Sequence, residues 1–292
     1  MYFSKLNAYL SRLPRSKIEF EKLWVDNDGR VQGQFFNCAL TSQFQPVRTL
    51  EGYIRAFDAH AHSYSKEDSG LSVWRMLNNA ASDDESIELD RLCRMLHVLN
   101  FFRQAERFDG SLLIGVHERL LAAVSSNHGV VFRRILDGLE LPIERILLQL
   151  PHVHPDRHWM IGFVVENYRR NGFRIATHAA SANEAAEHLE QVRPDLIRID
   201  SYAPGEAERL ANVVEHADAL GTTLLFARVD RESDLSVIST ALELSGITLT
   251  ERLWVTGALA GQYRASLGDI RAPSDSLSPR AVREASAITP QT

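Results

Sequence analysis

Short apolar segments alternate with helical segments along most of this chain, and this alternation constrains the fold more than any other feature. Predicted strands cover residues 111–117, 145–150, 172–178, 195–200, 222–229 and 252–259, and the stretches between them carry helical periodicity. Strands joined by helices form a parallel sheet that is covered on both faces. Because the series contains no glycine-rich dinucleotide fingerprint, we predict an α/β fold with a closed, TIM-like (β/α)8 barrel rather than an open sheet.

The segment before this series follows a different pattern. Residues 1–22 predict a short helix whose apolar face is most often a packing surface, formed by Leu6, Leu10 and Leu13. Residues 23–62 predict three strands, with turn signals at Asn27-Asp28-Gly29 and Glu51-Gly52. A longer helix is predicted over residues 90–107.

These patterns divide the chain into three parts. Residues 1–39 form an N-terminal extension of helix and strand, and residues 40–263 form the barrel. Residues 264–292 are rich in Ser, Ala and Pro, and we predict a disordered tail there.

Composition narrows the classes of partner. The 292 residues carry a formal net charge of −6, which argues against a nucleic acid polymer as ligand. Basic residues interrupt the first apolar stretch, and no later stretch is long and apolar enough to span a membrane, so we expect neither a signal peptide nor a membrane partner. Two distant cysteines, Cys38 and Cys93, form no disulfide framework and favour a reduced, cytoplasmic setting.

Polar residues, many of them histidines, stand where the predicted strands end. In a barrel of this class the carboxyl ends of the strands carry the functional groups. The residues at these ends are Asp58, His60, His62, His117, Gln149, His152, His178, Arg198, Asp200, Ala227, Asp230 and Thr256. A second histidine cluster, PHVHPDRH at 151–158, contains prolines and is interpreted as a surface loop.

The ordered set of these segments resembles the EAL-domain family of cyclic di-GMP phosphodiesterases. QPVRTLEGYIRAFDAHAH is similar to the opening of that family, with Asp58-Ala59-His60 in place of Glu-Ala-Leu. The similarity continues in order through GLSVWRML, IELDRL, LLIGVH, LLQLPH, GFRIATHAAS, DLIRID, LLFARVD and LWVTGALAG. It covers residues 40–263 and implies an EAL-type barrel.

The resemblance also implies a chemistry and the positions that would carry it. The family binds cyclic di-GMP and hydrolyses one phosphodiester with two Mg²⁺ or Mn²⁺ ions, which require oxygen ligands. At the matching positions this chain has Asp58 for Glu, His117 for Asn, Gln149 for Glu, His178 and Ala179 for Asp-Asp, Arg198 for Lys, Ala227 for Glu, Asp230 for the next Glu, Thr256 for Gln and His62 for Arg. Asp200 is kept.

These replacements favour loss of the family's catalysis. A carboxylate about 4 Å from a divalent ion contributes roughly 8 kcal/mol at an effective dielectric constant near 20. Gln149, His178 and Ala179 remove three such charges, so we expect no metal cofactor and no hydrolysis. The predicted function is a catalytically inactive regulatory protein related to cyclic di-GMP signalling. A protein partner or homodimer would bind through the N-terminal helix or residues 63–86.

Two alternatives remain open. The chain could bind cyclic di-GMP, as a receptor or as a phosphodiesterase that retains Mg²⁺ or Mn²⁺; the candidate nucleotide-binding residues are His62, Arg198, Asp200, Arg228 and Asp230. The chain could instead hold Zn²⁺ in a rebuilt hydrolase site, since nitrogen and oxygen ligands suit that ion. The candidate zinc ligands are Asp58, His60, His117 and His178.

Overall fold

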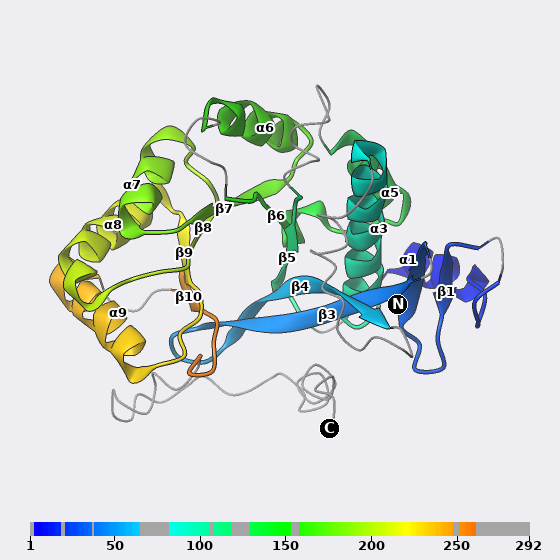
Figure 1. Ribbon diagram of the computed structural model, residues 1–292, viewed down its shortest axis with the longest axis horizontal. Helices are drawn as coiled ribbons and strands as arrows, with labels where there is room; N and C mark the ends of the chain where they lie inside the picture. Colours follow the sequence, from blue (N-terminus) through cyan, green and yellow to red (C-terminus); the bar gives the residue numbers. More distant parts are fainter. Residues whose placement is uncertain are drawn as a thin grey trace.

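A computed structural model describes residues 3–18, 21–36, 38–64, 82–105, 108–117, 129–152, 158–247 and 251–260 (Figure 1). The predicted tail 264–292 and most of the predicted interaction segment 63–86 lie outside these residues, as does the middle of the histidine cluster at 151–158. Within the described ranges, no helix has both the length and the apolar character needed to cross a membrane.

Eight strands form the predicted barrel (Figure 1). Their order around the ring is β3-β10-β9-β8-β7-β6-β5-β4, and pairing between β3 and β4 closes it. The bounds are β3 (Cys38–Thr49), β4 (Ile54–Tyr64), β5 (Ser111–Gly115), β6 (Ile146–Gln149), β7 (Arg174–Ala179), β8 (Leu196–Ile199), β9 (Thr223–Phe226) and β10 (Leu253–Val255). The TIM-like barrel expected from the alternation is therefore confirmed.

One strand of the barrel runs against the others. Strands β4 to β10 pair in parallel, as predicted, whereas β3 is antiparallel to both β4 and β10. The cause is the turn after β3, because a parallel connection needs a crossover of a dozen or more residues. Gly52 provides the left-handed backbone of this turn, with φ of 95°.

The N-terminal extension continues the sheet beyond the barrel. Strand β1 (Leu23–Val25) pairs with β2 (Val31–Phe35), and β2 pairs with the first residues of β3. The predicted boundary at residue 40 thus falls inside β3. Helix α1 (Ser4–Arg12) buries Leu6 fully and packs Leu10 and Leu13 against the same core, which confirms that its apolar face is a packing surface.

Helices cover the outside of the barrel (Figure 1). They are α3 (Asp83–Phe102), α5 (Val130–Gly138), α6 (His158–Arg170), α7 (Ala182–Gln191), α8 (Ala207–Leu220) and α9 (Glu232–Ser245), with short 3-10 turns η2 (Ile143–Arg145) and η4 (Pro204–Glu206). Helix α3 begins seven residues before the predicted start because Ser82 and Glu85 form a reciprocal capping box.

One layer of apolar side chains fills the barrel interior. Each of the eight strands contributes one buried residue to it: Val47, Ala56, Leu113, Leu147, Ala176, Leu196, Leu225 and Trp254. The barrel is therefore a packed core at this level and not a pore. Two larger clusters lie outside the ring, between the strands and the helices that cover them.

We expect Leu147→Ala to lower the free energy of unfolding by about 2–5 kcal/mol, because the shortened side chain leaves a cavity in a layer that all eight strands share. Chemical denaturation measures this loss. The matched control is Leu244→Ala on α9, whose parent side chain is 54% exposed. Equal losses in the two variants would contradict a packed interior.

Candidate functional site

The positions of the inner-layer residues determine which side chains point inward at the barrel mouth. Side chains along a strand alternate between its two faces, so the position two residues beyond each inner-layer residue also points inward. In the parallel strands these positions are Asp58, Gly115, Gln149, His178, Arg198, Ala227 and Thr256. Half of the strand-end residues singled out in the sequence therefore share one layer at one end of the barrel.

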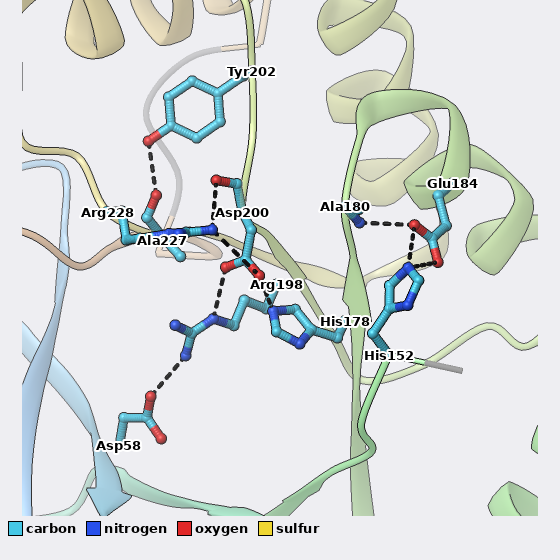
Figure 2. A network of polar contacts seen from close by, with 10 residues as sticks. All are labelled: Asp58, His152, His178, Ala180, Glu184, Arg198, Asp200, Tyr202, Ala227 and Arg228. Atoms are coloured by element: carbon cyan, nitrogen blue, oxygen red, sulfur yellow. Dashed lines mark hydrogen bonds and ion pairs between the residues drawn. The ribbon is translucent and has the colours of Figure 1, made fainter. Parts of the chain in front are cut away.

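Asp58 on β4 is the most buried carboxylate of this layer. Only 6% of its side chain is exposed. Arg198 on β8 donates from Nη1 to Asp58 Oδ2 over 2.7 Å (Figure 2). Nε2 of His60 lies 3.5 Å from the same oxygen. The carboxylate is thus held by two basic side chains from two strands.

Asp200, which directly follows β8, lies beside three basic groups. The Nε of Arg198 donates to its Oδ1 over 3.1 Å, and Nε2 of His178 on β7 forms an ion pair with its Oδ2 (Figure 2). Arg228, which follows β9, places Nη2 3.9 Å from the same Oδ2. Arg198 is therefore shared: its guanidinium bridges Asp58 and Asp200.

These contacts outweigh burial in setting the charge of the carboxylates. Burial raises the pKa of Asp58, but His60 and Arg198 together bring that pKa below its usual value. At Asp200 burial is opposed by His178 and then by Arg198, which lowers the pKa to about 2. Both carboxylates are consequently ionised at neutral pH.

The basic partners shift in the opposite direction. Burial lowers the pKa of His60, but the hydrogen bond and charge of Asp58 reverse this, so the pKa of His60 is raised. Burial likewise lowers the pKa of Arg198, and its two carboxylate partners raise it above the ordinary value. The carboxylates thus favour the charged forms of His60 and Arg198.

Other predicted site residues lie apart from this network. His117 is buried, and its backbone N–H donates to Oδ1 of Asp90 on α3. Oε1 of Gln149 is buried and has no hydrogen-bond partner among the described residues. Ala179 packs in the outer core, and Ala227 offers only its carbonyl, which accepts from the hydroxyl of Tyr202.

The remaining candidates for nucleotide binding differ in exposure. His62 is half-buried on β4, two residues beyond His60 and on the same face of the strand. Asp230 accepts from the backbone N–H of Ala258 and so organises the loops after β9 and β10. Arg228 is 67% exposed and has a left-handed backbone with φ of 57°. Arg228 is the most accessible cation of this set.

The donor set does not fit the two hard dications that the family resemblance implies. Within the described ranges, no three His, Cys, Asp or Glu side chains lie close enough to hold a metal ion. Asp58 and Asp200 both face the guanidinium of Arg198. The four candidate zinc ligands are not gathered either: Asp58 contacts His60, whereas His178 contacts Asp200.

Two polar contacts near the mouth were not anticipated from the sequence. Asp90 and Arg94, one helical turn apart on α3, form a buried ion pair of 2.7 Å below His117. His152 places Nε2 3.0 Å from Glu184 in the first turn of α7 (Figure 2). The i,i+4 spacing could have revealed the first pair, whereas no sequence signal links the second.

Comparison with known proteins settles the family. A family model described as the EAL domain matches residues 28–241. This chain belongs to the EAL domain family. The resemblance to this family is therefore confirmed, and the match begins within the N-terminal extension and ends at residue 241. No curated protein matches the chain.

Solved EAL structures share the fold at low sequence identity. The Bacillus subtilis YkuI protein, in complex with substrate c-di-GMP and calcium, is 18% identical with a TM-score of 0.59; the alignment covers 84% of this chain and 60% of that one. The Xanthomonas citri FimX EAL domain in complex with c-diGMP is 15% identical (TM-score 0.57; 76% and 87% covered).

A standalone EAL protein from Vibrio cholerae O395, in its c-di-GMP-bound form, is 16% identical, and the alignment covers 78% of this chain and 93% of that one with a TM-score of 0.54. This EAL chain thus spans nearly the whole Vibrio protein but less than two thirds of YkuI. At these identities the likeness establishes the fold.

The lowered pKa of Asp200 predicts how stability depends on pH. A depressed carboxyl pKa stabilises the folded chain above the unfolded value of about 3.9, and this stabilisation is lost as pH falls toward about 2. We expect Asp200→Asn to lower the free energy of unfolding by about 2 kcal/mol at pH 7 and by much less near pH 2.5. Denaturation at several pH values tests this, with the exposed Asp218→Asn as control. A difference that stays constant with pH would contradict it.

Proposed function

We propose that this EAL domain acts in cyclic di-GMP signalling without hydrolysing the dinucleotide, and that it works by binding a protein partner or a second copy of itself. The observation that carries the proposal is the guanidinium of Arg198, which bridges Asp58 and Asp200 at the barrel mouth. A cation of the chain itself thus engages the two carboxylates that the family resemblance assigns to metal chemistry.

The positions of the other ligands support the same proposal. Where the resemblance implies carboxylates, this chain has the amide of Gln149, the imidazole of His178 and the methyl group of Ala179. Each missing carboxylate removes roughly 8 kcal/mol of attraction for a nearby dication. The guanidinium of Arg198 is too basic to accept a proton from an attacking water, unlike the lysine it replaces.

An interaction role uses parts of the molecule that remain intact. The barrel core is complete, and the N-terminal extension adds two strands and a helix to it. At the turn between β2 and β3, Phe36 is 63% exposed, an aromatic anchor of the kind that protein interfaces favour. We infer that a partner binds this extension, and the free thiols Cys38 and Cys93 favour a cytoplasmic setting.

The first test is hydrolysis. We expect the purified protein with Mg²⁺ or Mn²⁺ to leave cyclic di-GMP intact, because the mouth lacks the anionic oxygens that two ions need. Chromatography of the products measures this, with an active EAL phosphodiesterase as positive control. Linear product that disappears in Asp58→Ala would refute the proposal.

Metal analysis of the purified protein tests the zinc alternative. A content near one zinc per chain, lost in a His117→Ala/His178→Ala variant, would favour the zinc hydrolase instead.

A metal-free receptor for cyclic di-GMP is the second candidate function. One structural neighbour, Klebsiella pneumoniae BlrP1, was solved with FMN and cyclic diGMP and no metal ions, at 17% identity and a TM-score of 0.53. In the present chain Arg228 is exposed and His62 shares a strand face with His60, and these two basic groups support the proposal that a phosphate binds at the mouth.

Calorimetric titration in EDTA separates the receptor from the interaction module. A receptor should bind cyclic di-GMP with sub-micromolar affinity, and Arg228→Ala should weaken binding about tenfold through loss of one charged contact. Arg209→Ala on α8, whose parent side chain is 62% exposed, is the matched control. If the wild-type protein does not bind cyclic di-GMP, the receptor function is excluded and the partner-binding function remains.

A further inference from the structure

Arg198 crosses the barrel. In the closed ring, β4 and β8 are separated by three strands in either direction, so they face each other across the interior. Arg198 extends from β8, and its Nη1 reaches Oδ2 of Asp58 on β4 over 2.7 Å. We propose that Arg198 is a resident cation, which takes the electrostatic place of a divalent metal and braces the mouth between opposite strands. This inference rests on the proposed function, which it deepens by naming what holds the site together.

The shape of the guanidinium suits this role. Arg198 uses two different nitrogens, Nη1 toward Asp58 and Nε toward Asp200, so one planar group serves two carboxylates that belong to different strands. A lysine ammonium is a compact point charge without this fixed fork. Replacing lysine by arginine at this position therefore changes the cation from a single contact into a bridge.

The bridge is shielded from water. The exposed fractions of the side chains are 16% for Arg198, 6% for Asp58 and 17% for Asp200. Removing one partner of such a network leaves an uncompensated charge in a poorly solvated site. The brace should consequently contribute to stability, unlike an ion pair at the surface.

The bridge also explains why the carboxylates do not act as metal ligands. The oxygens that face the interior already accept from Arg198, and a dication placed between them would meet a fixed positive charge. Without the guanidinium, Asp58 and Asp200 would face each other, with His60 and His178 beside them. Carboxylate oxygens suit Mn²⁺. The inference thus predicts that loss of Arg198 uncovers affinity for a divalent cation.

The test compares wild type, Arg198→Met and the surface control Arg209→Met by thermal denaturation, in EDTA and in about 1 mM MnCl₂. In EDTA, Arg198→Met should melt at least about 5 °C below wild type, and Arg209→Met should match wild type. Mn²⁺ should raise the Tm of Arg198→Met by about 3 °C and leave the other two unchanged. An Arg198→Met variant with wild-type Tm and no response to Mn²⁺ would overturn the inference.

Two further measurements keep the result decisive. If Arg198→Met does not fold, Arg198→Lys should fold with a Tm below that of wild type, because it keeps the charge and loses the second contact; a Tm equal to wild type would overturn the brace. Paramagnetic resonance of Mn²⁺ with the wild-type protein should show only free ion, and bound ion would overturn the resident cation. Bound Mn²⁺ without hydrolysis would refute this inference alone, whereas hydrolysis of cyclic di-GMP would refute the proposed function.

Discussion

The structure depends on one ring of apolar side chains, to which every strand of the barrel contributes a single residue. This layer closes the interior, so the next inward position of each strand is the first that can reach water. Charged groups of Asp58 and Arg198 meet at this position. The pleat of the sheet thus determines which residues meet at the mouth, while their chemical types decide what the mouth can bind.

A buried carboxylate at that position needs a cation. Asp58 is almost fully enclosed, and an ionised carboxylate without a partner would lose far more solvation than the fold could replace. A metal ion can satisfy this need, and so can an arginine. In this chain Arg198 does so, and its charge helps to keep the pKa of Asp58 and of Asp200 below the ordinary value.

The replacements at the mouth are mutually consistent in charge. Gln149, His178 and Ala179 stand where the family resemblance implies carboxylates, so fewer negative charges remain to be balanced. A single guanidinium with neighbouring imidazoles is paired with Asp58 and Asp200. Two dications here would leave an excess of positive charge, and the full carboxylate set with one arginine would leave an excess of negative charge.

Sequence reasoning predicted much of this arrangement but not its contacts. Periodicity located the strands from 111 onward and placed Asp58 and Arg198 at strand ends, because alternation is a local property. It could not show that the two residues meet, since they lie 140 positions apart and are opposite only once the ring has closed. The prediction that the histidines could bind zinc relied on residue type alone, without knowledge of which side chains meet. The antiparallel direction of β3 could have been predicted from the short turn at Gly52, because a parallel connection needs a much longer crossover.

Catalysis and binding differ in how far each tolerates replacement of residues at its site. Two-metal hydrolysis requires ions and nucleophile to be positioned within a fraction of an ångström, so a single misplaced charge at the mouth strongly lowers the rate of hydrolysis. A docking surface requires only that the fold persists and presents its exposed groups. The arginine brace that we propose would favour a docking function and oppose metal-dependent hydrolysis, because the guanidinium that joins opposite sides of the barrel also places a positive charge beside both carboxylates. The exchange of a metal site for an internal ion pair, as we propose it, is therefore coherent with the binding role that we propose for this EAL barrel.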